Sequence, residues 1–397
     1  MTHPLPQKDN CCGCSVCTNA CAKKAITMSY DKEGFLYPVV DEQLCVDCGI
    51  CAKVCPNNNT DNLNNPFSCV YGGYSSDPEV MQNCTSGGFV TELSKIVVNS
   101  GGVVAGVRYS DDYVKAEYDI ATSNDELKSF MGSKYVQSEK GDIYKKVKEH
   151  LDSAEKKTVL FVGCPCDVWA LKRYLKKDYE NLITCELVCM GVTSYTVAEQ
   201  YKKYTEKKNR SSLVYINARS KKKGWYVPHL EERFVNGKTK LTTLFGTMYG
   251  YGFQVYNRPS CFSCHYRGEN GVADFRVGDF WGIKPEDAFW NKDGVSCIFV
   301  RTPKAQAFIK QLSENGFNLY ETQYSTATEN NMSSYKNKDE KYLKLRDRFT
   351  EIYLKDGLKS ACRKTESISV KLKRILPADI QPAVKRIYHL LYDKKRK

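Results

Sequence analysis

Eight of the nineteen cysteines lie in two runs near the start of the sequence. Both runs have the spacing C-x2-C-x2-C-x3-C, first in Cys11, Cys14, Cys17 and Cys21 and then in Cys45, Cys48, Cys51 and Cys55. In such a run three thiolates bind one iron-sulfur cubane and the fourth binds the partner cubane. The sequence therefore predicts two [4Fe-4S] clusters, one bound by Cys11, Cys14, Cys17 and Cys55 and the other by Cys45, Cys48, Cys51 and Cys21.

Zinc and disulfides are the alternatives for these thiols. Structural zinc sites usually combine two C-x2-C pairs, so a doubled run of four cysteines would be an unusual zinc site. Disulfides form in oxidising compartments, and residues 1–10 contain no apolar secretory segment. We therefore expect a cytoplasmic protein whose first part resembles a bacterial-type ferredoxin with two [4Fe-4S] clusters. Such a module transfers single electrons and has no substrate, so the rest of the chain should contain the site that exchanges them.

Four later cysteines are further candidates for chemistry. Cys166 follows a predicted strand, Cys189 ends another, and Cys261 and Cys264 form a C-x2-C pair. Thiolates in loops and at strand ends can converge on a metal, whereas a lone cysteine in an apolar strand is more often a small buried residue. Spacing alone leaves both interpretations open.

Two glycine-containing turns are candidate cofactor sites. The turn Ser86-Gly87-Gly88 opens a predicted helix, whose free N–H groups and dipole favour an anion such as the pyrophosphate of a flavin nucleotide. The alternative is an N-cap serine followed by glycines that allow close packing. Residues 163–166 lie at the carboxyl end of a predicted strand, the edge at which ligands bind in open α/β sheets. The alternative there is a tight turn alone.

The elements that must position these groups follow from the residue patterns. Residues 25–40 alternate apolar and polar residues around an Asp-Lys-Glu-Gly turn and predict a hairpin. The Asn-rich residues 57–66 predict a linker. Residues 67–208 alternate strand and helix patterns, which favours a mostly parallel sheet covered by helices. Residues 213–300 are richer in strands and include a hairpin that turns on Asn236-Gly237.

The positive charge of the chain is concentrated at its C-terminal end. The formal net charge is +13, and residues 370–397 carry nine Lys or Arg against two Asp, a net +7. No nucleic-acid-binding motif accompanies this charge, so we do not expect nucleic acid as a partner. Apolar residues beside the basic ones predict an amphipathic helix, which either lies peripherally on an anionic membrane or packs on the body with a solvated face.

Six ordered motifs carry a resemblance to a known family. They are TSGG at 85–88, GSKYVQS at 132–138, GCPC at 163–166, LVCMGV at 187–192, RPSCFSC at 258–264 and VGDFWG at 277–282. Over roughly residues 10–310 the chain closely resembles the coenzyme F420 hydrogenase/dehydrogenase beta-subunit family, in the form with an N-terminal ferredoxin module. The resemblance implies one FAD and a third [4Fe-4S] cluster beside it.

Carried over position by position, the resemblance implies specific ligands. The third cluster would be bound by Cys166, Cys189, Cys261 and Cys264. The FAD would be lined by Ser86, Gly87, Gly88, Lys134, Tyr135 and Gln137. Asp279 and Trp281, close in sequence to the cysteine pair, would act structurally and shape the redox site. Three positions depart from the family pattern, namely Cys164, Asp167 and Met190, so the family's substrate is not transferred with its fold and cofactors.

The resemblance implies an α+β or α/β chain of four parts. These are a bacterial-ferredoxin-like module (1–60), the N-terminal part (67–150) and the C-terminal part (151–320) of a mixed α/β flavin-binding body, and a helical basic tail (321–397).

The resemblance also implies an FAD- and iron-sulfur-dependent oxidoreductase. Electrons would pass between the ferredoxin-type clusters and FAD, with a hydride exchanged with a small-molecule substrate. That substrate would be coenzyme F420 or another metabolite, such as a sugar in polysaccharide biosynthesis, and a ferredoxin or other redox protein would be the partner. The alternative is an electron-transfer adaptor subunit of a larger redox complex, without a substrate of its own.

Overall fold

The computed structural model describes residues 5–61, 63, 65–331 and 337–367. The predicted amphipathic helix in residues 370–397 lies outside these residues. The last described helix is α13 (Glu340–Thr365), which bends at Gly357, where the φ of 79° favours glycine. None of the described helices combines the length and the apolar character needed to cross a membrane.

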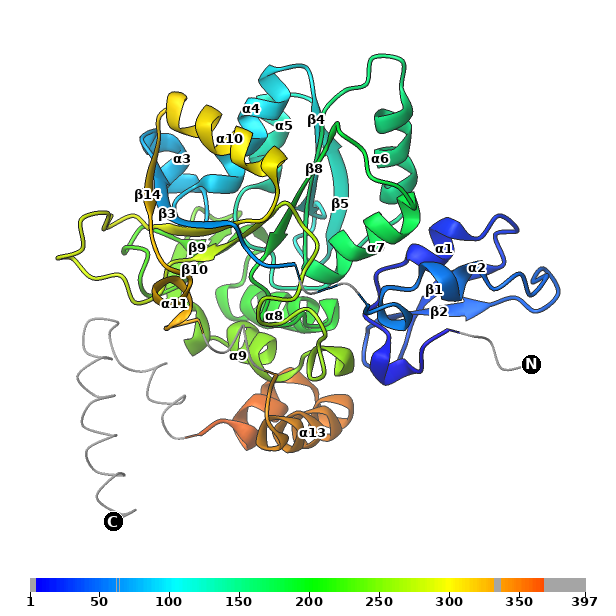
Figure 1. The fold of residues 1–397 in the computed structure, drawn as a ribbon. Helices are drawn as coiled ribbons and strands as arrows, with labels where there is room; N and C mark the ends of the chain where they lie inside the picture. The colour runs from blue at the N-terminus through cyan, green and yellow to red at the C-terminus, as the bar shows by residue number, and fades with distance from the viewer. Residues whose placement is uncertain (1–4, 62, 64, 332–336, 368–397) are drawn as a thin grey trace, which may run out of the picture.

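The ferredoxin-like module is built from one hairpin and two short helices (Figure 1). β1 (Ile26–Tyr30) pairs antiparallel with β2 (Leu36–Val40), which confirms the predicted hairpin. α1 (Val16–Ala20) and α2 (Ile50–Val54) each contain the third cysteine of a run and end directly before the fourth. The C-x3-C spacing therefore places both cysteines on one helical turn. Two 3-10 turns flank these elements, η1 (Lys8–Asn10) and η2 (Pro56–Asn58).

Nine strands form one mixed sheet in the body, which confirms the predicted mixed α/β fold. Their order is β14-β3-β13-β12-β8-β7-β4-β5-β6. In chain order they are β3 (Cys69–Ser75), β4 (Val103–Tyr109), β5 (Ala116–Ala121), β6 (Ser138–Glu139), β7 (Val159–Gly163), β8 (Leu182–Leu187), β12 (Phe275–Asp279), β13 (Ser296–Val300) and β14 (Phe317–Glu321).

The prediction of a mostly parallel sheet is correct for the four central strands and for the short pair of β5 and β6 at one edge. β12, β8, β7 and β4 are mutually parallel, whereas β5 joins β4 antiparallel, and β13, β3 and β14 add antiparallel pairs on the other side. The reason is that a short turn after β4 and a helix-free loop after β12 supply no crossover helix, which a parallel connection usually requires. The sheet is therefore mixed.

Helices cover both faces of the sheet (Figure 1). α4 (Phe89–Asn99) and α10 (Pro303–Glu314) cover one face, and α6 (Ile143–Asp152) and α7 (Pro165–Leu175) cover the other. Because strand side chains alternate between faces, Leu160 packs with Phe89 and Leu93 on the first face, while its neighbours Val159 and Phe161 pack on the second. α3 (Pro78–Asn83), α5 (Asn124–Leu127), η3 (Lys128–Phe130) and α11 (Tyr324–Thr328) complete this part.

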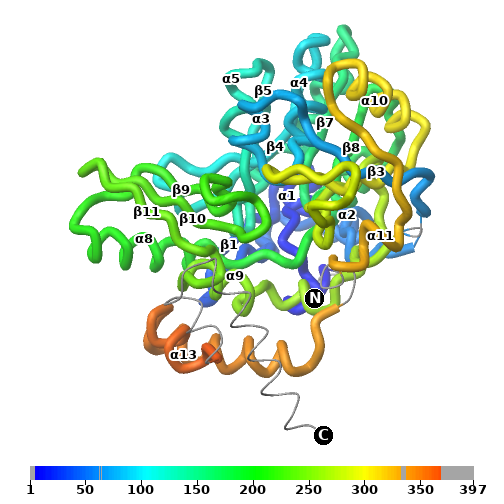
Figure 2. The backbone as a smooth tube through the Cα atoms, turned by 90° about the vertical axis from the view of Figure 1, so that its left-hand side faces the viewer, coloured from blue at the N-terminus to red at the C-terminus, as the bar shows by residue number. Residues whose placement is uncertain are grey.

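A second, three-stranded antiparallel sheet lies beside the large one (Figure 2). It contains β9 (Leu213–Ser220), β10 (His229–Phe234) and β11 (Thr239–Thr243), and the predicted hairpin at Asn236-Gly237 joins the last two. α8 (Tyr195–Asn209), α9 (Met248–Val255) and α13 pack against it around a common apolar core. The turns η4 (Leu244–Gly246) and η5 (Pro259–Cys261) flank α9.

One buried arginine fastens the ferredoxin-like module to the body. Arg258 is fully buried, and its Nε donates to the carbonyl of Cys11 (2.6 Å) while its Nη1 donates to Gln137 Oε1 (2.9 Å). Gly13 is required beside it, because a Cβ there would meet Gln137 Nε2 at 2.5 Å and the Arg258 guanidinium at 2.7 Å. The first cysteine run therefore lies directly against the body.

The predicted linker at residues 57–66 is also held by the body at several points. The Trp169 indole donates to the carbonyl of Asn59 (2.9 Å), and the Tyr266 hydroxyl donates to Asn57 Oδ1 (3.0 Å). The Gly271 N–H donates to the carbonyl of Leu63 (2.7 Å). This segment thus continues the contact between module and body.

Candidate redox site

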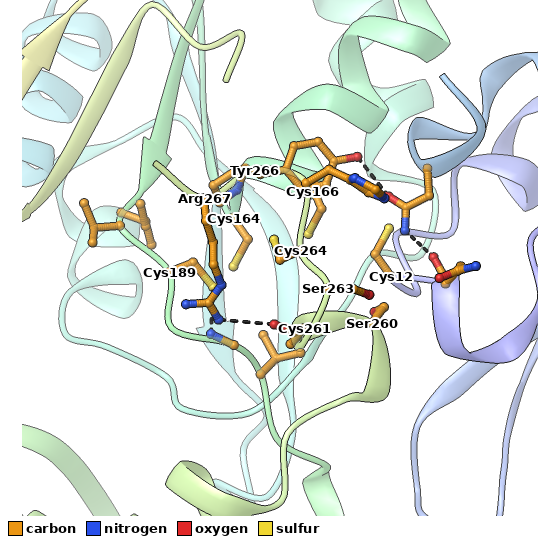
Figure 3. A pocket seen from close by; sticks show the side chains of 18 of the residues that line it. Cys12, Cys164, Cys166, Cys189, Ser260, Cys261, Ser263, Cys264, Tyr266 and Arg267 are labelled. Atoms are coloured by element: carbon orange, nitrogen blue, oxygen red, sulfur yellow. Dashed lines mark hydrogen bonds between the residues drawn. The ribbon is translucent and has the colours of Figure 1, made fainter. Parts of the chain in front are cut away.

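Six cysteines line one small cavity of about 50 Å³ at the junction of module and body (Figure 3). Four of them are the cysteines assigned to a third cluster by resemblance, Cys166, Cys189, Cys261 and Cys264. Cys166 lies in the first turn of α7, after β7, and Cys189 follows β8. β7 and β8 are parallel neighbours, so their carboxyl ends meet at one edge of the sheet. The loop that begins with η5 brings the other two cysteines to the same edge.

The remaining two cysteines of this cavity are Cys12, which sequence reasoning missed, and Cys164, which it named only as a departure from the family pattern. Cys164 is the N-cap of α7 and lines the cavity together with Cys189. The C-P-C spacing with Cys166 was a signal for it. Cys12 comes from the module and lines the cavity together with Cys166. No local pattern indicated that placement, because it brings together residues 154 positions apart in the chain.

The eight cysteines of the module separate into a buried and a more accessible set. Cys11, Cys14, Cys17 and Cys55 are buried, whereas Cys21, Cys45 and Cys51 are half-buried and Cys48 is exposed. Burial, followed by the neighbouring Cys11 and Cys55 thiols, raises the pKa of the Cys17 thiol to about 12. The last cysteine of the second run thus lies with the first set.

The sets differ in their position relative to the body. The buried set includes Cys11 and Cys14, which neighbour the six-cysteine cavity, and the accessible set reaches the protein surface at Cys48. In the described part of the chain, no three His, Cys, Asp or Glu side chains are grouped as ligands of a single metal ion.

A second, larger cavity of about 540 Å³ adjoins the small one. The two cavities share a wall that includes Cys12, Cys164, Cys166 and Cys189. Ligand pockets for small molecules and cofactors typically measure about 300–1,000 Å³. The large cavity is therefore a suitable size for a nucleotide cofactor that contacts the cysteine-lined wall.

The N-terminus of α4 opens onto the large cavity through Ser86, Gly88 and Phe89. Gly88 is the N-cap, and no side chain caps the helix, so the first N–H groups are free to bind an anion. Gly87 lies between Ser86 and Gly88, and its contact with FAD stays a prediction. Its position is closely packed, because a Cβ there would lie 2.1 Å from the carbonyl oxygen of Gly73.

Lys134, Tyr135 and Gln137 line the same cavity. The Lys134 ammonium donates to the carbonyls of Phe130 (2.8 Å), Met131 (2.9 Å) and Gly132 (3.1 Å). Burial lowers its pKa to about 7. Gln137 has a second contact, because its Nε2 donates to the carbonyl of Cys12 (3.1 Å). This residue therefore joins the large cavity to the module.

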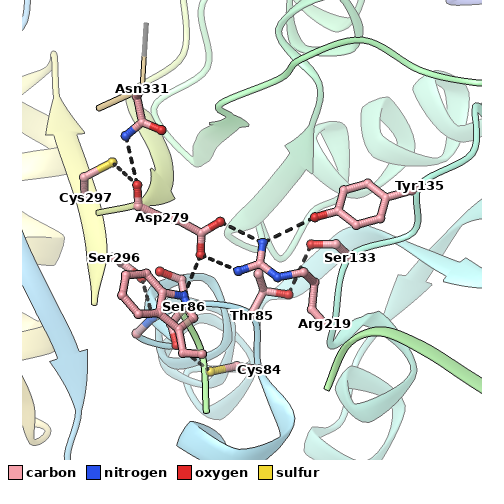
Figure 4. A network of polar contacts seen from close by, with 12 residues as sticks. Cys84, Thr85, Ser86, Ser133, Tyr135, Arg219, Asp279, Ser296, Cys297 and Asn331 are labelled. Atoms are coloured by element: carbon pink, nitrogen blue, oxygen red, sulfur yellow. Dashed lines mark hydrogen bonds and ion pairs between the residues drawn. The ribbon is translucent and has the colours of Figure 1, made fainter. Parts of the chain in front are cut away.

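A buried ion pair forms another part of the wall (Figure 4). Arg219 binds Asp279 through two hydrogen bonds of 2.8 Å, and its Nη1 also donates to the Tyr135 hydroxyl (3.3 Å). Burial alone would raise the pKa of Asp279, but the Arg219 guanidinium outweighs burial and holds that pKa below its usual range. Sequence reasoning missed Arg219, which lies on β9 of the small sheet.

Two tryptophans accompany this pair. The rings of Trp225 and Trp281 are stacked, with centroids 5.0 Å apart and planes 7° apart, and the Trp225 indole donates to Asp279 Oδ1 (2.9 Å). Asp279 and Trp281 line the large cavity and not the small one. The expectation that they shape the redox site stays a prediction, and the structure places them in the wall of the large cavity.

The three departures from the family pattern also line the large cavity. Asp167 is matched by Lys140, with 3.1 Å between the charged groups and both side chains almost fully buried. The Tyr118 hydroxyl donates to Asp167 as well (3.1 Å). The cavity wall near the cysteines therefore combines this ion pair with Cys164 and Met190, and it differs there from the family pattern.

Comparisons with known proteins match most of the chain. A "4Fe-4S dicluster domain" matches residues 10–59. Two models of the coenzyme F420 hydrogenase/dehydrogenase beta-subunit family match the body. The model of the N-terminal part of this beta subunit matches residues 70–143, and the model of its C-terminal part matches residues 156–324.

Individual relatives are distant. An uncharacterized protein of Methanocaldococcus jannaschii is 23% identical over 70% of this chain and 73% of its own length. The coenzyme F420 hydrogenase subunit beta of Methanococcus voltae is 26% identical over 61% of this chain and 80% of its own. A chain of the F420-reducing [NiFe] hydrogenase complex from Methanosarcina barkeri has a TM-score of 0.47 and 16% identity, over 74% of this chain and 96% of that one.

Proposed function

Since the chain belongs to the coenzyme F420 hydrogenase/dehydrogenase beta-subunit family and begins with a 4Fe-4S dicluster domain, it is an iron-sulfur redox protein. We propose that it is an oxidoreductase that uses three [4Fe-4S] clusters and one FAD to exchange electrons with a small-molecule substrate. When bound, the clusters would supply single-electron transfer, and FAD would supply hydride exchange with the substrate.

The observation that supports this proposal most strongly is the shared wall of the two cavities. A cluster in the six-cysteine cavity and a flavin in the large cavity would lie on opposite sides of Cys12, Cys164, Cys166 and Cys189. The buried cysteine set of the module lies beside this wall, and the accessible set lies toward the surface. The cysteines therefore extend from the protein surface to the large cavity, as a route for electrons between a redox partner at the surface and the proposed FAD would require.

The residues of the chain have distinct roles in this proposal. Cys11, Cys14, Cys17 and Cys55 would hold one cluster, Cys21, Cys45, Cys48 and Cys51 a second, and Cys166, Cys189, Cys261 and Cys264 a third. The N–H groups at the start of α4 would bind the pyrophosphate of FAD. The Arg219–Asp279 pair and Trp281 would orient the ring system and exclude water from that part of the cavity.

Anaerobic reconstitution tests the cofactor content directly. We expect about twelve irons per chain, because three cubanes each hold four, and one FAD per chain. Iron and flavin assays on the desalted protein give both numbers. A protein that takes up zinc alone, or that never retains flavin, would contradict the proposal.

The charge of Lys134 should make flavin binding depend on pH. Because the pKa of Lys134 is lowered to about 7, its ammonium is charged below that pH and becomes neutral as the pH rises through it. A positive charge in the cavity wall favours the FAD pyrophosphate, so we expect FAD affinity to fall roughly tenfold, about 1.4 kcal/mol, between pH 6 and 8.5. Fluorescence titration of the cluster-loaded, flavin-free protein measures this change.

Two variants of the same residue serve as controls for this pH dependence. Lys134→Arg stays charged over the whole range and should bind tightly at every pH, whereas Lys134→Gln stays neutral and should bind weakly at every pH. If the Arg and Gln variants keep the slope of the unmodified protein, another group causes it and the role assigned to Lys134 is wrong.

The substrate is tested by reoxidation of the reduced protein with coenzyme F420 and a panel of small metabolites that includes sugars. The second candidate function is an electron-transfer adaptor, which is favoured by the relative named as a hydrogenase subunit. Turnover by the isolated chain would support the enzyme, and turnover only after a partner protein is added would support the adaptor. A ferredoxin is the first partner to test.

A further inference from the structure

Arg267 lies in the wall of the six-cysteine cavity, although it belongs to none of the proposed ligand sets (Figure 3). It follows Cys264 by three positions in the sequence, and only 7% of its surface is exposed. An arginine side chain stays protonated in proteins. A permanent positive charge is therefore held beside the proposed third cluster, which we call the body cluster.

The Arg267 guanidinium joins the two loops that carry Cys189 and Cys261. Its Nη2 donates to the carbonyl of Met190 (3.2 Å), in the loop after β8, and to the carbonyl of Cys261 (3.2 Å), in the loop that begins with η5. Because both contacts go to backbone oxygens, they leave the thiols available as ligands. The charge of one side chain is thus fixed between two loops that each supply a proposed ligand.

The wall of the six-cysteine cavity carries positive charge. Among the described residues that line it, Arg267 and Arg276 are positively charged, and none is an Asp or Glu. Arg276 binds Glu186 (2.7 Å), a buried carboxylate that also binds Arg301 (2.8 Å). The charge of Arg276 is therefore shared with a carboxylate outside the cavity lining, and Arg267 is the residue at which we test the charge of the wall.

The sign of the expected effect follows from the charges involved. Four thiolate ligands make a bound [4Fe-4S] cluster negative, and reduction adds one more negative charge. A nearby positive charge stabilises the more negative state, and this attraction is stronger away from bulk water. Because net charge is among the factors that set cluster potentials, a buried guanidinium beside the ligands should raise the potential.

We propose that Arg267 is a positioning residue whose positive charge raises the potential of the body cluster. Arg267 itself gains and loses neither an electron nor a proton. A higher potential at this point makes the body cluster a better acceptor for electrons that arrive from the module. The proposal rests on the three-cluster function proposed above, because the charge acts on the third of those clusters.

Redox titration of the reconstituted full-length protein, followed by electron paramagnetic resonance, tests this role with three variants at one position. Arg267→Lys keeps the charge but loses the forked guanidinium, Arg267→Gln removes the charge and Arg267→Glu reverses it. We expect the midpoint potential of one cluster to become more negative in that order. In Arg267→Gln its reduction should be roughly tenfold less favourable, which is about 59 mV for one electron.

The other readouts should not change. We expect all three variants to keep about twelve irons per chain and the two module clusters to keep their potentials. Arg348→Gln makes the same substitution at an exposed arginine on α13. This variant is the matched control, and all of its potentials should equal those of the unmodified protein.

Several results would overturn the proposal. Unchanged potentials in Arg267→Gln and Arg267→Glu would show that the charge has no influence, and equal shifts in the Lys and Gln variants would show that loop geometry causes them. Loss of about four irons from any of the three variants would show that Arg267 assembles the ligand loops instead. An unmodified protein without a third cluster would defeat the proposed function and this inference together, whereas about twelve irons with unshifted potentials would defeat this inference alone.

Discussion

Replacement of Cys261 and Cys264 by serine in one variant is expected to lower the iron content from about twelve to about eight per chain. Both residues come from the loop that begins with η5, and no other proposed cluster uses them. Without its third cluster, the route between the module and the large cavity is broken. We therefore expect the double variant to lose flavin reduction by ferredoxin, while the signals of the two module clusters remain.

The loop itself should survive this change. Arg267 Nη2 donates to the carbonyls of Met190 and Cys261 (both 3.2 Å), and these contacts do not involve the thiols. Cys69→Ser is the matched control and should keep about twelve irons. Iron assay, flavin assay and gel filtration separate loss of one cluster from misfolding. If the double variant still holds about twelve irons, the six-cysteine cavity does not bind a cluster through this pair.

Breaking the Arg219–Asp279 pair should have the largest effect on stability. Removing one partner from a buried ion pair typically costs about 3–5 kcal/mol, because the other charge stays buried without compensation. We expect Arg219→Met to lower the free energy of unfolding by about this amount at neutral pH and to weaken FAD binding. Urea unfolding followed by tryptophan fluorescence measures the change, because Trp225 and Trp281 lie beside the pair.

The pH dependence of this variant has a definite sign. In the unmodified protein the lowered pKa of Asp279 adds stability above the carboxyl's unfolded pKa, and this stability is lost as the pH falls. In Arg219→Met the Trp225 indole still donates to Asp279, but the guanidinium that outweighs burial is gone, so the pKa of Asp279 rises. The stability difference between the two proteins should therefore be largest near pH 7 and shrink toward pH 4. A difference that does not change with pH would contradict this assignment.

Two further variants complete the test. Arg219→Met combined with Asp279→Asn removes both charges, so its cost should be smaller than the sum of the two single costs. Lys148→Met removes one partner of an exposed ion pair with Asp152, and such pairs contribute at most about 1 kcal/mol. Additive costs for the buried pair would show that its two charges do not stabilise each other in the folded protein.

Some features of this protein could be predicted from the sequence because they depend on near neighbours in the chain. The hairpin at residues 25–40 and the one at Asn236-Gly237 depend on alternating residues around a short turn, and both form as expected. The iron-sulfur character of the module follows from spacings of two or three residues. The family assignment, which rested on six short motifs in a specific order, is confirmed by the matching family models.

The prediction of a mostly parallel sheet was only partly correct, because it extended a local rule to all the strands of residues 67–208. The alternation of strand and helix patterns correctly located β4, β7 and β8. It could not show that β5 pairs antiparallel with β4, or that β13 pairs antiparallel with β12. Those directions depend on which strands become neighbours.

The sequence by itself therefore determined the fold class. It also determined the family and the cysteine positions from which the cofactors are predicted. The tertiary structure alone decided that Cys12 and Cys166 line one cavity, that Arg219 pairs with Asp279 and that the two cavities share a wall. These arrangements bring together residues that are 154 and 60 positions apart. No periodic pattern encodes such pairs, because their distance depends on how separate elements pack. For that reason the sequence predicted each group of cluster ligands separately. It did not predict the order of these groups from the protein surface to the interior.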